Sequence, residues 1–226
     1  MKKHRNRRAG TAAKPGTRVR LQSRGRDRGE PATSPEGARQ TIHRLRLELA
    51  QARRQIEDLR ASADRDVLLD IFNRRAFVRA VDRSIAYIKR YGATGALILI
   101  DVDHLKPIND SFGHAAGDKV LKAVARTLTA QVRSSDVVGR LGGDEFGVLL
   151  WNLSAADAEA KARSLEHAID TLSFEFDQRT VHAGASAGIA ILDIHADPAR
   201  ALEQADRAMY VRKAERRHAC GTLVRA

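Results

Sequence analysis

The chain has 226 residues and a mass of 24.9 kDa, which fits one ordinary domain with attached segments. Hydrophobic residues make up 43% and charged residues 30%, so a folded core is expected. No stretch approaches the ~18 apolar residues that a membrane span requires, which excludes a membrane-spanning protein. The single cysteine, Cys220, excludes a disulfide scaffold and a Cys-based zinc site, and it agrees with a cytoplasmic location.

The positive charge is concentrated at the N-terminus. Residues 1–41 hold 12 of the 40 Lys and Arg residues and 3 acidic residues, so they carry +9 of the net charge of +12. They contain almost no large apolar side chains, and this composition predicts a disordered tail. The basic start is not followed by the apolar segment of a secretory signal. Two interpretations stay open: an arm that touches nucleic acid or an acidic membrane surface, and a solvated extension or a start site assigned too far upstream.

Residues 42–65 follow a heptad pattern. Apolar side chains recur at positions a and d, namely Ile42, Leu45, Leu49, Ala52, Ile56, Leu59 and Ala63. The stripe is narrow and confined to these two positions, which favours a parallel two-helix coiled coil over the wider apolar face of a globular helix. The segment is therefore predicted to be a dimerisation helix. The alternative is a single amphipathic helix that lies on the following domain.

The remaining chain alternates predicted helices and strands. Helices are expected over 74–90, around 120–128, over 158–172 and from 202 onward, and strands over 96–100, 137–141, 146–151 and 180–192. The Gly-Gly pair at 142–143 joins two of these strands as a hairpin. This order predicts one mixed α/β (α+β) domain.

Two acidic pairs are expected to meet at one end of the sheet. Asp101 and Asp103 follow the apolar run, and Asp144 and Glu145 lie at the hairpin tip. Converging carboxylates without nearby His or Cys suit Mg²⁺ or Mn²⁺, the ions used in phosphoryl transfer on nucleotides. Each pattern also occurs as a simple turn or cap, so spacing alone leaves both interpretations open.

Four motifs, in order along the chain, resemble those of the GGDEF diguanylate cyclases, which condense two GTP into cyclic di-GMP. They are DVLLDIFNRR at 66–75, DVDHLKPINDSFGHAAGD at 101–118, LGGDEF at 141–146 and ADRAMYVRK at 205–213. The resemblance implies a sheet like that of nucleotide cyclases and polymerase palms, with surrounding helices. It divides the chain into a tail (1–41), a coiled coil (42–65), a GGDEF domain (66–218) and a C-terminal tail (219–226).

The resemblance implies a role for several residues around the acidic pairs. The carboxylates of Asp101 and Asp144 and the carbonyl of Val102 match ligands of Mg²⁺ or Mn²⁺, and Glu145 matches a metal-linked or acid–base group. Further residues match groups that hold the triphosphate: the side chains of Lys106, Lys213 and Arg217, and the backbone around His104 and Leu105. An alternative interpretation of Lys106 is a solvated turn residue.

Asn109 and Asp118 match the residues that read guanine. A carboxylate accepts hydrogen bonds from guanine N1–H and N2–H, and an amide donates to an acceptor on the base edge. Adenine would leave these polar groups unpaired and would be rejected. An alternative interpretation of Asp118 is a helix cap. His114 is predicted to be a structural residue.

Arg133 and Asp136 form an R-x-x-D pattern, and five residues separate Asp136 from Gly142. Members of the family carry a product-inhibition site at this offset, where the arginine would hold phosphate or guanine and the carboxylate would accept from guanine. The alternative is an ordinary surface ion pair.

The sequence departs from the family motifs at several positions. Leu69-Asp70 replaces Thr-Gly, Leu105 replaces a phenylalanine, Leu141 replaces a tyrosine, and Arg216-Arg217-His218 replaces the closing motif. None of these changes removes a predicted ligand. Asp70 puts a charge where a flexible glycine is expected, in a segment predicted to be a hinge.

The resemblance predicts an enzyme that works as a homodimer. Each domain would hold one GTP, so two domains must face each other, and tethering through residues 42–65 raises their effective concentration. Two alternatives remain at this point. One is a catalytically silent module that binds cyclic di-GMP through Arg133 and Asp136. The other is a nucleic-acid-binding protein that acts through residues 1–41, with strongly salt-dependent binding.

Overall fold

The computed structural model describes the backbone of residues 35–223, without the side chains of residues 35–36, 56–62 and 219–223. The predicted tail therefore lies outside the described residues, except for its last part. Residues 1–51 and 52–226 form two units, and each is described by itself. No helix in the described part of the chain combines the length and the apolarity needed to cross a membrane.

Helix α1 spans Pro35–Ala63 and contains the predicted heptads. It begins at Pro35 rather than near Ile42, and proline suits a first helical turn because that turn leaves its N–H groups unbonded. Ile42, Leu45 and Leu49 are each about half exposed in the single chain. The prediction of a helix is confirmed over this range. Pairing with a second copy stays a prediction.

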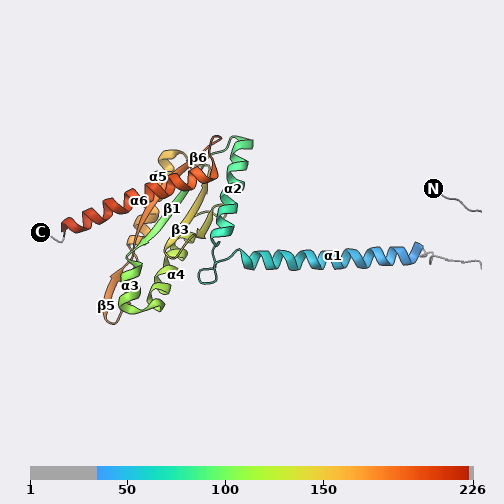
Figure 1. The fold of residues 1–226 in the computed structure, drawn as a ribbon, viewed down its shortest axis with the longest axis horizontal. Coiled ribbons are helices and arrows are strands. Elements are labelled where there is room, and N and C mark those ends of the chain that lie inside the picture. The colour runs from blue at the N-terminus through green and yellow to red at the C-terminus, as the bar shows by residue number, and fades with distance from the viewer. Residues whose placement is uncertain (1–34, 224–226) are drawn as a thin grey trace, which may run out of the picture. The chain divides into compact units, whose positions relative to one another are not determined.

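The sheet is antiparallel with strand order β2-β3-β1-β6 (Figure 1). Strand β1 (Gly95–Asp103) lies between β3 (Glu145–Trp151) and β6 (Gly184–Leu192), and β2 (Val137–Arg140) pairs with β3 at the edge. Every residue of β1 is buried. The apolar run at its centre is thus a buried central strand, as predicted.

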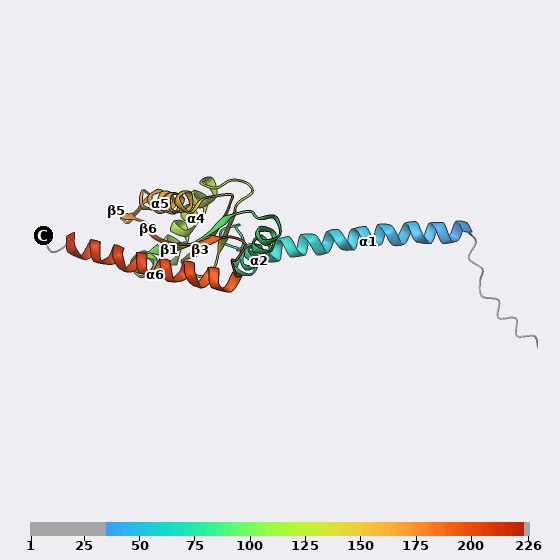
Figure 2. The same cartoon turned by 90° about the horizontal axis from the view of Figure 1, so that it is seen from above.

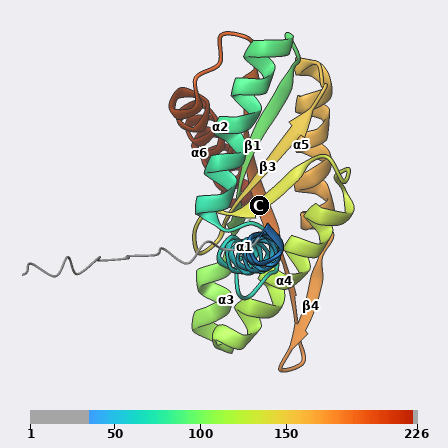
Figure 3. The ribbon, with the colours of Figure 1, turned by 90° about the vertical axis from the view of Figure 1, so that its right-hand side faces the viewer.

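Two helical layers cover the two faces of this sheet (Figures 2 and 3). Alternate residues of β1 point to opposite faces. Leu97 and Leu99 pack with α2 (Arg74–Tyr91) and α6 (Pro198–Leu223). Ile98, Ile100 and Val102 pack with the other layer, which includes α4 (His114–Ala130) and α5 (Ala155–Asp170). By this alternation, Asp101 and Asp103 share the face that α6 covers.

A close approach between α6 and the sheet depends on Gly188 in β6. A Cβ atom added there would lie 2.0 Å from the backbone nitrogen of Met209 in α6. Only glycine permits this contact without moving backbone. The contact fixes α6 against β6, and α6 carries Lys213 toward the end of β1.

A hydrogen-bonded turn precedes α2. Asp66 accepts from the backbone N–H groups of Leu68 and Leu69, both at 3.0 Å, and Asn73 caps α2 by accepting from the N–H of Ala76. These contacts explain the Asp and the Asn of the opening motif. Asp70 adopts a left-handed conformation with φ 54°, which accounts for the glycine expected at this position.

Two elements were not predicted, and a third, at residues 179–182, was predicted only as part of a longer strand. Helix α3 (Leu105–Phe112) buries only Leu105 and Ile108, so it is too short to show a helical period. Strands β4 (Ser173–Phe176) and β5 (Arg179–His182) form a separate hairpin. Its two turn residues, at 177–178, both have positive φ, although neither is glycine.

Several boundaries also differ from the predictions. The strand predicted over 180–192 is interrupted at Ala183 and contributes to two different sheets. The helix predicted to run to 172 ends at Asp170. The last helix continues to Leu223, into the predicted C-terminal tail. Periodicity places element centres better than ends, because ends depend on caps and tertiary contacts.

Candidate active site

The antiparallel pairing of β1 with β3 brings the two acidic pairs together. Asp101 lies opposite Glu145 in the register, and the backbone N–H of Val102 donates to the carbonyl of Asp144 at 3.0 Å. The strand order therefore agrees with the arrangement predicted from the motifs. β1 extends through Asp103, so Asp101 and Asp103 lie inside the strand rather than after it.

Asp101 is a buried carboxylate with a lysine partner. Its side chain accepts a hydrogen bond from Lys213 Nζ in α6. Burial raises the pKa of Asp101, Lys213 opposes this rise, and the negative charges of Asp144 and Asp103 add to it. A cation at this end of β1 would stabilise the ionised form. Lys213 supplies one positive charge there.

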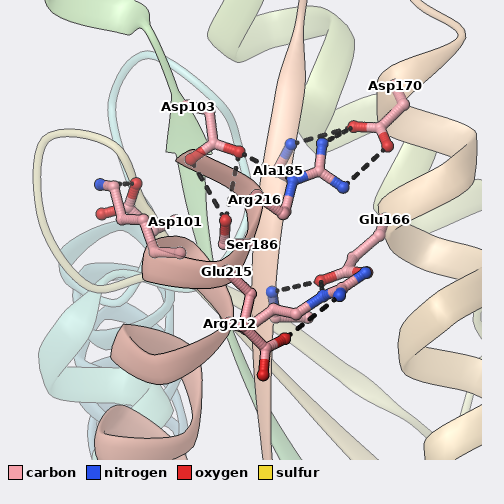
Figure 4. Close-up of polar contacts among 11 residues, drawn as sticks. Asp101, Asp103, Glu166, Asp170, Ala185, Ser186, Arg212, Glu215 and Arg216 are labelled. Atoms are coloured by element: carbon pink, nitrogen blue, oxygen red, sulfur yellow. Dashed lines mark hydrogen bonds and ion pairs between the residues drawn. The ribbon is translucent and has the colours of Figure 1, made fainter. Parts of the chain in front are cut away.

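Asp103 is held by protein groups from β6 and α6 (Figure 4). Ser186 Oγ lies 3.2 Å from both carboxylate oxygens, and Arg216 Nε lies 3.4 Å from Oδ2. Arg216 also donates to Asp170 at 2.7 and 3.0 Å. The second Asp of the D-x-D motif thus ties β1 to α6, and through Arg216 to α5. The family resemblance implied a role for Arg217, whereas no role was predicted for Arg216.

A second buried carboxylate anchors α6 one turn earlier (Figure 4). Glu166 is 5% exposed and accepts from Arg212 Nη2 at 2.9 Å and from the backbone N–H of Ala187 at 2.8 Å. Arg212 is also near Glu215, and these carboxylates, Glu166 foremost, raise the pKa of its guanidinium. Two ionic contacts between α5 and α6 therefore fix the helix that carries Lys213.

The donors at the end of β1 fit a hard divalent cation. Asp101, Asp144 and the Val102 carbonyl offer only oxygen, the ligand that Mg²⁺ and Mn²⁺ prefer. Within residues 35–223, no three His, Cys, Asp or Glu side chains form a ready metal cluster. An ion here would need further oxygen ligands, and nucleotide phosphates supply them in many phosphoryl-transfer sites.

A cavity of about 530 Å³ opens beside Asp103 and Asp144, and neither Asp101 nor Glu145 is among its lining residues. It contains the predicted phosphate-binding groups His104, Leu105, Lys106, Lys213 and Arg217, together with Val102, Asp103, Pro107, Asp144, His182, Ala183, Gly184 and Arg216. His104 has a left-handed backbone with φ 62°, directly before α3. Lys106 and Arg217 have exposed side chains, and neither forms an ion pair among the described residues. The cavity is therefore suited to a polyanion.

A second cavity, of about 300 Å³, shares Leu105, Lys106 and Asp144 with the first. Asn109 and Asp118 also line it, and the Oδ1 atom of Asn109 is buried without a hydrogen-bond partner. A buried acceptor without a partner is costly, and a ligand that donates to it would remove the cost. The two cavities thus adjoin at Lys106 and Asp144.

The contacts of α4 bear on two sequence interpretations. α4 begins at His114 after Gly113, so Asp118 lies in its second turn and the capping interpretation is wrong. His114, predicted to be structural, is exposed and lines the second cavity. A Cβ atom on Gly117 would lie 2.0 Å from Asn109 Oδ1. Gly117 therefore leaves room for the Asn109 amide.

Arg140 holds the Gly-Gly turn and was not identified from the sequence. It donates through Nε to the carbonyl of Gly142 at 3.0 Å and through Nη2 to that of Gly143 at 2.8 Å. Its Nη1 atom forms an ion pair with Asp66 at 3.3 Å. Arg140 thus links the signature loop to the opening motif. An arginine two residues before the Gly-Gly pair was the available signal.

The R-x-x-D residues line a third cavity, of about 600 Å³. Asp136 Oδ2 accepts from the backbone N–H of Arg133 at 2.9 Å, and its Oδ1 accepts from that of Trp151 at 3.3 Å. Among the described residues, the Arg133 side chain forms no ion pair with Asp136 or any other carboxylate. The surface ion-pair interpretation is therefore not what the structure contains.

Comparison with known families and structures bears on this arrangement. A family model described as "Diguanylate cyclase, GGDEF domain" matches residues 63–219. Diguanylate cyclase TpbB of Pseudomonas aeruginosa (strain UCBPP-PA14) is 41% identical over 175 residues, which cover 76% of this chain and 40% of TpbB. Probable diguanylate cyclase DgcE of Escherichia coli (strain K12) is 36% identical over 167 residues, which cover 74% of this chain and 15% of DgcE.

A solved structure gives a similar result. The GGDEF domain of DgcB from Caulobacter crescentus, solved in complex with c-di-GMP, has a TM-score of 0.65 and 26% identity, covering 68% of this chain and 91% of that one. The matched region spans 15–40% of the length of the curated relatives above. The chain belongs to the GGDEF family of diguanylate cyclases.

Proposed function

We propose that this chain converts two GTP molecules into cyclic di-GMP and two pyrophosphates. The observation that carries the proposal is the pair of adjoining cavities. One is lined by two lysines and two arginines, and the other by Asn109 and Asp118, with an unpartnered buried amide oxygen on Asn109. The two cavities meet at Lys106 and Asp144, so together they suit a nucleotide, with its phosphate chain in the first and its base in the second.

Guanine is the base that these donors and acceptors favour. Asp118 would accept from guanine N1–H and N2–H, and the amide of Asn109 offers both a donor and an acceptor to the base. Adenine lacks the N1–H and N2–H donors and would leave carboxylate oxygens unpaired, which is the costly outcome for a buried site. The proposed enzyme therefore prefers GTP to ATP.

The reaction forms two phosphodiester bonds. In each, the 3′-hydroxyl of one GTP attacks the α-phosphorus of the other, the bond to the β-phosphate breaks, pyrophosphate leaves and the hydroxyl loses its proton. We assign the triphosphate to Lys106, Lys213 and Arg217, and acceptance of the proton to Glu145 or solvent. A Mg²⁺ or Mn²⁺ ion held by Asp101, Asp144 and the Val102 carbonyl would polarise the phosphate.

The reaction needs two copies of the domain, because each provides one nucleotide site. The half-exposed heptad stripe of α1 supports pairing of two chains, with apolar a and d side chains buried between them. Such tethering would raise the effective concentration of the second domain. We therefore propose a homodimer through residues 42–65. A role of the basic segment 1–41 in binding nucleic acid or acidic surfaces remains a hypothesis about residues that the structure does not describe.

The R-x-x-D cavity supports product inhibition. The arginine side chain lacks a carboxylate partner among the described residues, and the cavity volume lies in the range of small-ligand sites. A catalytically silent binding module is the less favoured function. The carboxylates needed for catalysis, Asp101, Asp144 and Glu145, are all present.

GTP turnover tests the proposal. The full chain is incubated with GTP and Mg²⁺, and products are identified by chromatography, beside Asp144→Ala and a control, Asp82→Ala, which removes an exposed carboxylate of α2. We expect cyclic di-GMP and pyrophosphate from the parent and the control, and neither from Asp144→Ala. A folded parent that makes no product with either Mg²⁺ or Mn²⁺ would contradict the proposal and favour the silent module.

A further inference from the structure

The R-x-x-D cavity has three walls from distant parts of the catalytic unit. One is the segment that joins α1 to α2, the second is the C-terminal half of α4, and the third is the turn that leads into β2. The residues that line it are Arg65, Leu69, Asp70, Ile71, Phe72, Ala125, Arg126, Thr129, Ala130, Val132, Arg133, Ser134, Asp136, Val137 and Val138. It therefore extends well beyond Arg133 and Asp136.

Each wall of this cavity carries one guanidinium group. They belong to Arg65, Arg126 and Arg133. Neither Arg126 nor Arg133 forms an ion pair in the described part of the chain, and both side chains are exposed. Asp136 uses both carboxylate oxygens to accept backbone N–H groups. The arginine charges are thus poorly compensated, and an anionic ligand would compensate them.

Arg65 is the one of these arginines that has a protein partner. Its Nη1 atom lies 3.6 Å from Asp70 Oδ1 and also donates to the Asp70 carbonyl, while its guanidinium stacks over the Phe72 ring at 5.8 Å. The Asp70 side chain is 91% exposed, so this ion pair is weak. A phosphate can displace such a carboxylate at little cost.

We propose that Arg65 and Arg126 are phosphate-binding residues of the product site, which thereby spans the joining segment and α4. The ligand is a cyclic dinucleotide with two phosphates, and the apolar side chains of the cavity would contact its bases. The inference rests on the proposed product inhibition at Arg133 and Asp136. It adds two residues that the R-x-x-D pattern does not identify, and it gives Asp70 a function as a competitor for Arg65.

The position of Arg65 gives product binding a route to the active site. The joining segment is hydrogen-bonded to the sheet through the backbone of Phe72. Its N–H donates to the carbonyl of Val138 at 3.2 Å, and its carbonyl accepts from the backbone N–H of Arg140 at 2.7 Å. The same Arg140 holds the Gly-Gly turn and pairs with Asp66. A ligand that binds Arg65 and Arg126 therefore contacts the joining segment, and this segment is bonded to Arg140, which holds the signature loop.

Calorimetric titration of the full chain with cyclic di-GMP tests the inference. Bound nucleotide is removed first, and thermal melting shows that each variant is folded. Arg126→Ala and Arg65→Ala should each weaken binding about tenfold or more, the loss typical of a charged hydrogen bond. Asp70→Asn should tighten binding a few-fold, because it removes the competing charge. Arg163→Ala, which removes an exposed arginine of α5 outside the cavity, is the control and should bind like the parent.

Arg133→Ala separates this inference from the proposal on which it rests. If Arg133→Ala abolishes binding while Arg126→Ala and Arg65→Ala bind like the parent, the product site stands and the inference is wrong. If the parent itself binds no cyclic di-GMP, both are wrong. If Arg65→Ala fails to fold, an unchanged affinity of Arg126→Ala still contradicts the inference.

Discussion

The active site and the R-x-x-D cavity differ in how their charges are compensated. At the end of β1, the side chains of Asp101 and Asp103 are both 11% exposed, and Lys213 and Arg216 neutralise them from α6. In the R-x-x-D cavity, Arg126 and Arg133 are exposed and have no carboxylate partner among the described residues.

This difference indicates two modes of ligand binding. A buried acidic cluster with internal cations keeps a fixed geometry in the absence of ligand, and an incoming metal has to compete with the lysine. An exposed cationic cavity costs little when empty and gains electrostatic energy only when an anion arrives. The first arrangement suits catalysis and the second suits reversible control.

The largest change in stability is expected at the anchor of α6. Glu166→Ala leaves Arg212 and the N–H of Ala187 without their buried acceptor, which should lower the free energy of unfolding by about 2–3 kcal/mol. Glu159→Ala removes a comparable but exposed partner of Arg163 and should change it by less than about 0.5 kcal/mol. Urea unfolding measures both. Equal losses in the two variants would contradict the distinction between buried and exposed ionic contacts.

A smaller and more specific effect is expected at Gly117. The Cβ atom of Gly117→Ala would meet Asn109 Oδ1 at 2.0 Å, so the amide must move out of its position. Overpacking of this kind costs about 1–2 kcal/mol, and because the displaced amide belongs to the base site, the affinity for GTP should fall about tenfold. Cyclic di-GMP affinity should stay unchanged, because Gly117 does not line the R-x-x-D cavity. A parallel loss at both sites would show a general disturbance of α4 instead.

The smallest effect is a shift with pH. The pKa of Asp101 is raised, so the carboxyl binds protons above its usual range and protons compete with metal there. Mn²⁺ affinity, measured by calorimetry, should therefore weaken as pH falls toward this pKa. Without metal the sign for stability is opposite: a raised folded-state pKa favours folding at low pH, and this contribution is lost as pH rises through it. Metal affinity that stays constant as the pH falls from 7 to the ordinary aspartate pKa of 3.8 would contradict this description of Asp101.

The sequence predicted the parts of this molecule that depend on local pattern. The apolar run of β1, the Gly-Gly hairpin and the amphipathic helix α2 lie where the sequence pattern predicted them. The motifs also identified several residues that line the two adjoining cavities, among them Lys106, Asn109 and Asp118. These features could be read because each depends on residues close together in the chain.

The features that could not be predicted from the sequence depend on tertiary contacts. Arg216 and Arg140 act through partners far away in the sequence, at Asp170, Asp103 and Asp66, and one arginine among many gives no signal of its own. The hairpin of β4 and β5 depends on two non-glycine residues with positive φ. The third cavity brings Arg65 next to Arg133 only because the joining segment packs beside β2.

The central claim is that each cyclic di-GMP molecule is made by two domains acting together. Loss of activity in mixed dimers tests this claim most directly. Parent chain and Asp144→Ala are refolded together in varying ratios, and cyclic di-GMP formation is measured at constant total protein. If each product needs two competent domains, activity falls as the square of the parent fraction, so a one-to-one mixture keeps about a quarter of the parent rate. A linear fall, with half the rate in that mixture, would show that one domain completes the reaction alone and would contradict the account.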